Sequence, residues 1–190
     1  MVTKIFPKDF IFGTAVASYQ VEGGIYNNDW TYWENKKNTV CAEPCNDACK
    51  HYEFYREDIN LLDDLGIRAF RFSIEWSRIE PQEGQYDLSE INHYVDKSKL
   101  LLEKNITPIV TFHHFTTPEW LMNDGLWTSE KISTAFINCL LLTKSEPSAN
   151  INVSFFSLGC VLHNFQIFCS ISSAKILLLL SFNSLNNLFN

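Results

Sequence analysis

Polar side chains follow three separate apolar segments of this chain, and their types suit hydrogen bonding to a ligand. Gln20 follows the first segment, Glu75 ends the second, and the adjacent His113 and His114 end the third. Amide and imidazole groups can both donate and accept hydrogen bonds. The carboxylates Glu22 and Glu75 are better explained as solvated or ion-paired groups than as catalytic ones. The three positions form one site only if the fold brings the ends of the segments together.

The cysteines offer a second, weaker candidate for chemistry. Cys41, Cys45 and Cys49 recur every four residues, and His51 follows them closely. Cys-x3-Cys-x3-Cys is not a usual zinc spacing, so free or buried thiols in a reducing compartment are the favoured explanation. We therefore predict no metal site.

Three segments that could position these side chains are predicted to be strands. Residues 10–17 and 107–115 are short apolar runs bounded by turn-forming residues. Residues 67–76 alternate with a period of two, which predicts a strand with one apolar face and one polar face. The apolar face carries Phe70, Phe72, Ile74 and Trp76, and the polar face carries Arg71, Ser73 and Glu75.

Helices are predicted between the strands. Apolar residues recur every three or four positions over residues 47–65 and 88–102. We expect Asp47 to be the N-cap of the first helix and Gly66 to follow its C-terminus. Asp87 and Glu90 form a capping box for the second helix. A third helix is expected to begin near Ser129, and residues 25–46, which lack periodicity, are expected to form a long loop.

The alternation of strands and helices predicts an α/β fold with parallel strands. The two-faced second strand suits a closed barrel, in which one face packs on helices and the other lines the interior. Active sites of such barrels lie at the carboxyl ends of the strands, where the polar residues of this chain occur. A complete (β/α)8 barrel needs about 250 residues, whereas this chain has 190. We therefore expect a partial barrel of about three βα units.

The chain changes character near Pro147. Residues 1–147 carry nearly all the charge, whereas residues 148–190 contain a single charged side chain, Lys175. We expect residues 1–147 to form the partial barrel and residues 148–190 to be a divergent, apolar tail that is disordered or non-native. The net charge of −7 argues against a nucleic-acid partner. The tail's apolar run is too short for a membrane span, and the absence of a signal sequence predicts a cytoplasmic location.

Four stretches of the chain resemble family 1 of the glycoside hydrolases, the β-glucosidase group, in the family's order and roughly at its spacing. They are FIFGTAVASYQVEG at 10–23, HYEFYRED at 51–58, FRFSIEWSRIEP at 70–81 and TFHHFTTPEWL at 111–121. The resemblance implies a (β/α)8 TIM barrel, a retaining mechanism on β-linked glucosides or related sugars, and no cofactor. In that mechanism one carboxylic acid protonates the leaving oxygen and a second carboxylate attacks the anomeric carbon.

The resemblance also implies roles for single residues. Gln20 and His114 match positions that bind the hydroxyls of the sugar, and Arg71 matches the arginine that holds the nucleophilic carboxylate ionised. The residues alone leave alternatives open: Gln20 as a loop amide, and Arg71 paired with Glu75. His113 and His114 point to opposite faces of a regular strand, and the family pattern selects His114, which leaves His113 a structural role. By the same resemblance, Trp120 or Trp127 lines the sugar path.

The pair of reacting carboxylates is incomplete in this sequence. Thr143 to Pro147 is similar to the family's acid/base motif, which makes Glu146 a weak candidate for the acid/base. The nucleophile's Glu-Asn-Gly motif does not occur. We therefore expect an O-glycosyl hydrolase of β-glucosidase type that is truncated and weakly active or inactive. The alternative is a non-catalytic sugar-binding remnant or an aggregation-prone fragment.

Overall fold

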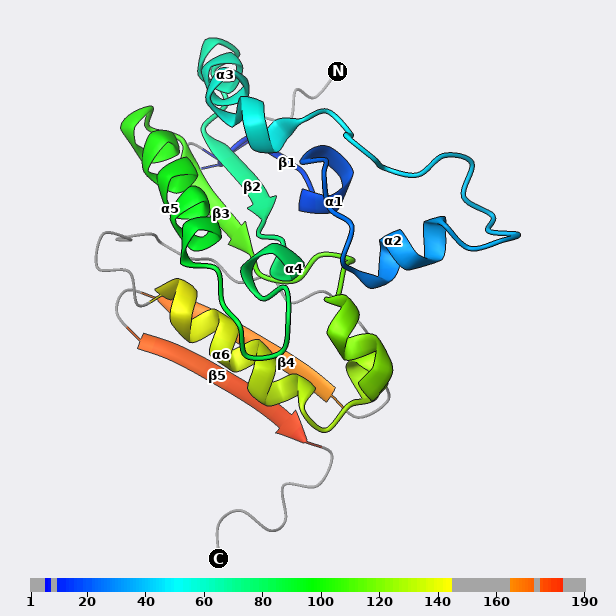
Figure 1. Ribbon diagram of the computed structural model, residues 1–190. Coiled ribbons are helices and arrows are strands. Elements are labelled where there is room, and N and C mark those ends of the chain that lie inside the picture. The colour runs from blue at the N-terminus through cyan, green and yellow to red at the C-terminus, as the bar shows by residue number, and fades with distance from the viewer. Residues whose placement is uncertain (1–5, 8–9, 145–164, 173–174, 183–190) are drawn as a thin grey trace, which may run out of the picture.

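A computed structural model describes residues 6–7, 10–144, 165–172 and 175–182. Its main sheet has three parallel strands in the order β1 (Gly13–Ala15), β2 (Ala69–Ser73) and β3 (Thr107–Thr111). Ala15 pairs with Arg71, and Arg71 pairs with Ile109 on the other side. The crossovers contain α3 (His51–Asp64) and α5 (Leu88–Glu103), which lie side by side on one face of the sheet (Figure 1). The predicted α/β class with alternating parallel strands and helices is confirmed.

The core forms between this sheet and its helices. Phe70 and Phe72 project from β2, and Ile74 follows it; all three are buried. Ile59 of α3 and Leu101 of α5 are fully buried within the same cluster. The predicted apolar face of the second strand is therefore confirmed as the surface that binds the crossover helices.

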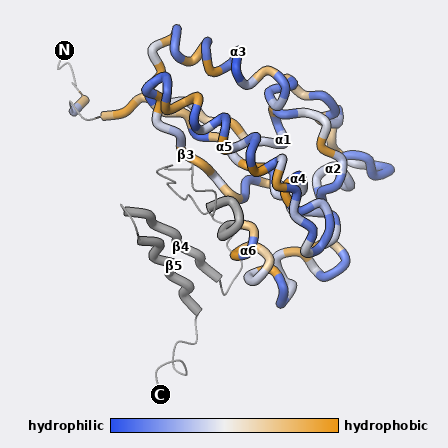
Figure 2. The backbone as a smooth tube through the Cα atoms, turned by 60° about the vertical axis from the view of Figure 1, so that its left-hand side comes forward, coloured by the Kyte–Doolittle hydropathy of each residue, from blue (hydrophilic) through white to orange (hydrophobic). Residues whose placement is uncertain are grey.

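The first strand differs from the prediction. A buried strand was expected over residues 10–17, but β1 has only three residues and all are exposed. Within the described chain β1 pairs with β2 alone, so it lies at the sheet edge. The rings of Phe6, Phe10 and Phe12 contact one another with centroids 4.5–5.1 Å apart, yet each is about half exposed. Figure 2 shows this hydrophobic stretch entering the molecule at its periphery.

The helices differ from three expectations. α3 begins at His51 with Lys50 as N-cap, in the left-handed conformation at φ 57°, so Asp47 is not the cap. Gly66, at φ 73°, follows the C-cap as expected. Asp87 caps α5 by accepting from the Ser89 amide at 2.8 Å, whereas the Glu90 carboxylate accepts from the Tyr52 hydroxyl. The predicted loop over residues 25–46 contains a short helix, α2 (Asp29–Glu34).

The remaining elements are short connections and the C-terminal strands. α1 (Ser18–Val21) follows β1, α4 (Trp76–Ile79) follows β2, and the 3-10 helices η1 (Glu119–Asp124) and η2 (Leu126–Thr128) follow β3. α6 (Ile132–Lys144) comes next, close to the predicted start at Ser129. β4 (Phe165–Ser172) and β5 (Lys175–Phe182) pair antiparallel within the low-charge tail. Among the residues described, no helix combines the length and apolar character of a membrane span.

Substituting Phe12 tests the contribution of the exposed aromatic rings. Phe12 is 58% exposed, so we expect Phe12→Ala to lower the free energy of unfolding by at most about 1 kcal/mol and to reduce self-association. Phe72 is fully buried, so Phe72→Ala should cost about 3–5 kcal/mol. Urea unfolding and light scattering measure the two effects. Equal losses of stability would mean that the Phe12 ring is buried in solution.

Candidate functional site

A buried carboxylate joins the loops that follow all three parallel strands. Glu75, just after β2, is completely inaccessible to solvent. It accepts hydrogen bonds from the hydroxyls of Ser18 after β1 at 2.9 Å, Ser77 at 2.7 Å and Thr116 after β3 at 2.9 Å. Burial raises the pKa of Glu75, and the three hydroxyls oppose that rise. We had expected Glu75 to be solvated or ion-paired. It is instead part of a hydrogen-bonded cluster.

Gln20 lies on α1, which this cluster holds in place. The Ser73 hydroxyl accepts from the Ser18 amide at 2.7 Å and donates to the Ser18 hydroxyl at 3.0 Å. Ser18 is therefore fixed to β2 through both its backbone and its side chain. Gln20, two residues later, is exposed at this edge of the sheet, so its amide is accessible to a ligand.

The other end of α1 is held by a second buried carboxylate. Glu22 is 2% exposed and accepts from the Arg78 guanidinium at 3.2 Å and from the Tyr94 hydroxyl at 3.0 Å. Arg78 also donates to the Gly23 carbonyl at 2.6 Å. Burial raises the pKa of Glu22 to about 7, against the attraction of Lys97 and Arg78. Because Glu22, the C-cap of α1, is buried and bound to Arg78 and Tyr94, it stabilises the loop.

Arg71 lies on the same face of β2 as Ser73, as the period of two requires, and Glu75 follows the strand. The Arg71 Nε donates to the Thr111 hydroxyl on β3 at 3.0 Å. The pairing with Glu75 that the residues alone allowed is therefore not the interaction observed. One N–H of the guanidinium is used, which leaves donors for a carboxylate.

The adjacent histidines differ in burial, although both follow the end of β3 at Thr111 and so lie outside the regular strand. His113 is buried, contacts the Trp127 ring with centroids 4.5 Å apart, and lies 3.3 Å from the Thr117 hydroxyl. Burial lowers the pKa of His113 to about 4. His114 is half-buried, and both burial and the charge of Arg71 lower its pKa.

The imidazole of His114 makes no hydrogen bond within the described part of the chain, and its Nδ1 is buried. Since its lowered pKa favours the neutral ring, one nitrogen can donate and the other can accept. His113 has the character of a structural histidine, with its ring enclosed and its partner inside the protein.

An aromatic group beside His114 was not anticipated from the sequence. The Phe115 ring stacks on His114 with centroids 4.3 Å apart, and Trp30 of α2 lies 5.4 Å from Phe115. Tyr19 of α1 contacts Trp30 at 6.2 Å. A helical interpretation of residues 29–34 would have predicted Trp30 and Trp33 on one face. These rings give the edge that carries Gln20 and His114 an apolar wall.

The two tryptophans assigned to the sugar path have internal partners. Trp120 donates to the Glu80 carbonyl at 3.0 Å and contacts Trp76, while Trp127 packs on His113 and donates to Thr117 at 3.2 Å. Both are half-buried. Their indole N–H groups are thus engaged inside the protein.

The cysteine segment does not form a metal cluster in the part of the chain that is described. Burial and the neighbouring Glu34 raise the pKa of the Cys45 thiol to about 11, and Glu34 accepts from the Cys45 amide at 2.9 Å. A protonated thiol is a poor metal ligand. Glu146, the acid/base candidate, lies outside the described residues.

Replacing Glu75 tests whether this carboxylate holds the three loops together. Glu75→Ala leaves three buried hydroxyls without their acceptor, so we expect the free energy of unfolding to fall by about 3 kcal/mol or more. Glu75→Gln keeps one acceptor oxygen and should cost less. Urea unfolding measures both. Glu57→Ala, at an exposed position of α3, is the matched control, and a similar loss there would contradict this role for Glu75.

The buried state of His113 predicts a pH dependence of stability. Its pKa is about 4 in the folded protein, below the ordinary value of 6.5, so the unfolded chain binds the additional proton between these values. The free energy of unfolding should therefore fall as the pH decreases across this window. In His113→Gln the fall should be shallower, as measured by urea unfolding across the window. Thr117→Val keeps the imidazole and should retain the wild-type slope; a wild-type slope in His113→Gln would overturn the assignment.

Comparison with known proteins identifies the family. Residues 2–141 match Glycosyl hydrolase family 1. The chain is 37% identical to beta-glucosidase A of Acetivibrio thermocellus over 139 residues, which cover 69% of this chain and 31% of that protein. Beta-glucosidase A of Thermotoga maritima is also 37% identical, over 72% of this chain and 32% of its own length.

Solved structures agree with the sequence relatives. The crystal structure of beta-glycosidase BGL167 superimposes with a TM-score of 0.76 at 40% identity, covering 80% of this chain and 36% of that one. A beta-glucosidase from Thermotoga maritima in complex with castanospermine gives a TM-score of 0.76 at 32% identity, with coverage of 82% and 37%. This chain thus spans about a third of the length of these relatives. With its parallel βα units matching the N-terminal part of their barrels, the chain belongs to glycosyl hydrolase family 1.

Proposed function

We propose that this chain carries the sugar-binding edge of an O-glycosyl hydrolase of β-glucosidase type, and that by itself it turns over glycosides weakly or not at all. The observation that supports this most directly is the cluster around Glu75, which joins the segments bearing Gln20, Arg71 and His114. The family's substrates are glycosides, so the ligand proposed is a β-linked glucoside or a related sugar.

The proposed contacts follow from the exposure and chemistry of two side chains. Gln20 presents an exposed amide, and His114 presents a neutral imidazole that lacks a hydrogen-bond partner within the described residues. Each group can donate to one hydroxyl oxygen and accept from another. The Phe115 ring beside His114 offers an apolar surface for the carbon-bound hydrogens of a pyranose ring.

Arg71 is proposed to serve the reacting carboxylate rather than the sugar. Its Nε is engaged by Thr111, and the remaining guanidinium N–H groups suit bidentate binding of a carboxylate. A positive charge there would lower the pKa of that carboxylate and keep it ionised for attack on the anomeric carbon.

Weak turnover is proposed because retaining hydrolysis needs two carboxyl groups about 5–5.5 Å apart. Glu22 and Glu75 are both buried and hydrogen-bonded, which leaves neither free to serve as a nucleophile. The sequence also lacks the Glu-Asn-Gly motif. These facts favour sugar binding without efficient hydrolysis as the second candidate function.

Glucose titrations test the binding proposal. We expect weak binding by calorimetry, lowered about tenfold or more by Gln20→Ala or by His114→Ala, because each removes paired hydrogen bonds. Lys37→Ala, at an exposed position, is the control and should leave the affinity unchanged. Full retention of binding in both site variants would refute the proposed contacts.

Hydrolysis of an aryl β-glucoside tests the weak turnover that we propose for this chain. Release of the phenol close to background is expected for this chain. Brisk release that Glu146→Gln abolishes would instead establish Glu146 as the acid/base and the chain as a complete catalyst.

A further inference from the structure

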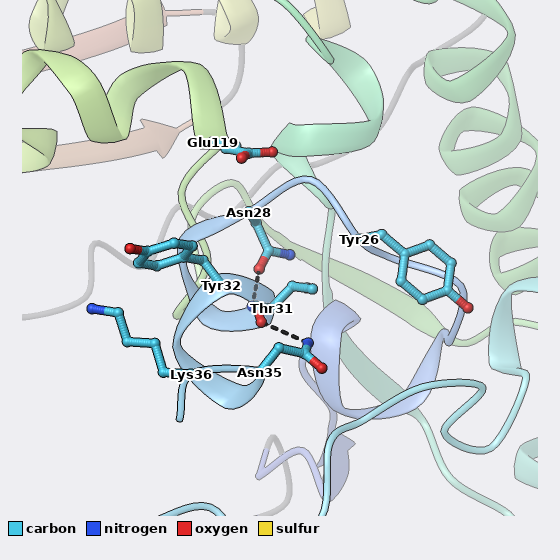
Figure 3. A pocket seen from close by; sticks show the side chains of 7 residues that line it. All are labelled: Tyr26, Asn28, Thr31, Tyr32, Asn35, Lys36 and Glu119. Carbon is cyan, nitrogen blue, oxygen red and sulfur yellow. Dashed lines mark hydrogen bonds between the residues drawn. The ribbon is translucent and has the colours of Figure 1, made fainter. Parts of the chain in front are cut away.

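α2 has two faces with different surroundings. Trp30 and Trp33 share one face and belong to the aromatic group beside His114. Thr31, Tyr32 and Asn35 share the opposite face, as the helical period requires. This second face borders a hollow of about 360 Å³, which Tyr26 and Glu119 complete (Figure 3). The hollow is thus separated from the His114 side by the helix itself.

The walls of the hollow combine aromatic rings with unused polar groups. Tyr26 is 63% exposed and Tyr32 is 51% exposed. Their hydroxyls and the Glu119 carboxylate make no hydrogen bond within the described part of the protein. Asn35 donates its amide N–H to the Thr31 carbonyl at 2.8 Å, which leaves its carbonyl oxygen as an acceptor. Figure 3 shows Tyr26 and Tyr32 on opposite sides of Thr31 and Asn35, with Glu119 above them.

The charges favour a neutral ligand. The Lys36 ammonium lies 4.6 Å from the centre of the Tyr32 ring and covers one of its faces. Glu119 supplies the opposite charge on the far wall. The two charges cancel, and the carboxylate disfavours phosphate and other anions. A hollow of this size falls in the range typical of small-molecule sites, about 300–1,000 Å³.

We propose that the hollow between Tyr26, Tyr32 and Glu119 is an accessory binding site for a neutral glycosyl unit, distinct from the site of Gln20 and His114. A pyranose has an apolar face that can lie against an exposed tyrosine ring. Its ring of hydroxyls matches the mixed donors and acceptors of the tyrosine hydroxyls, Asn35 and Glu119. This site does not depend on the proposed catalytic function, because it uses none of the residues assigned to that function.

Amide chemical shifts of the full chain during titration with cellobiose test the proposal. We expect saturable shifts at the amides of Tyr32, Asn35 and Lys36, and little change with sorbitol, which has hydroxyls but no ring. Tyr26→Ser and Tyr32→Ser should each raise the Kd about tenfold. Tyr32→Phe keeps the ring and should produce a smaller increase.

Two controls separate this site from the others. Phe54→Ser removes an aromatic ring of α3 that is 48% exposed and should leave the Kd unchanged. Gln20→Ala should also leave these shifts intact. A failure of the binding proposed for Gln20 and His114 can therefore be distinguished from a failure of this proposal. Thermal unfolding confirms that each variant is folded. The proposal is overturned if cellobiose produces no saturable shifts on α2, if sorbitol reproduces them, or if both serine variants bind as the wild type does.

Discussion

The geometry of the candidate site depends on one buried ionisable group, the carboxylate of Glu75, which is costly to bury without hydrogen-bond donors. Glu75 is completely enclosed, and an enclosed carboxylate without partners is strongly destabilising. It is accommodated because hydroxyls from the loops after β1, β2 and β3 all donate to it. The same hydrogen bonds that satisfy the carboxylate therefore fix the relative positions of the three loops. Gln20 and His114 each lie two residues from one of these hydroxyls. The same hydrogen bonds therefore fix their positions.

The C-terminal end of α1 is held by a second buried carboxylate, which has different partners. Glu22 is tied to Arg78 and Tyr94, and Lys97 is buried nearby with its ammonium 4.4 Å from the Phe72 ring. Burial lowers the pKa of Lys97 to about 8 and raises that of Glu22, so both shifts favour the uncharged forms. Three hydroxyls hold the carboxylate of Glu75, whereas a guanidinium and a phenol hydroxyl hold that of Glu22. Together they fix both ends of a helix too short to be stable by itself.

The sheet and the apolar and polar faces of β2 could be predicted from the sequence. Apolar and polar residues alternate along β2 with a period of two, which is typical of a β-strand. Burial of Phe70 and Phe72 follows from that period. The environment of Glu75 could not be predicted, since its donors Ser18 and Thr116 are 57 and 41 positions away. α2 was missed because six residues are too few to establish a helical period. β1 was predicted to be buried from its apolar content, but burial also requires a neighbour on its second edge.

Recognition and chemistry are physically separable in a barrel of this kind, because different strands supply them. The first three strands provide hydrogen-bonding groups, an aromatic wall and a guanidinium, all fixed by internal contacts of residues 10–139. The carboxylates of Glu22 and Glu75, which follow β1 and β2, are both buried and hold these loops in place. Freeing either for catalysis would release the segment that carries Gln20. The structural role of Glu22 and Glu75 thus argues against a catalytic role for either carboxylate.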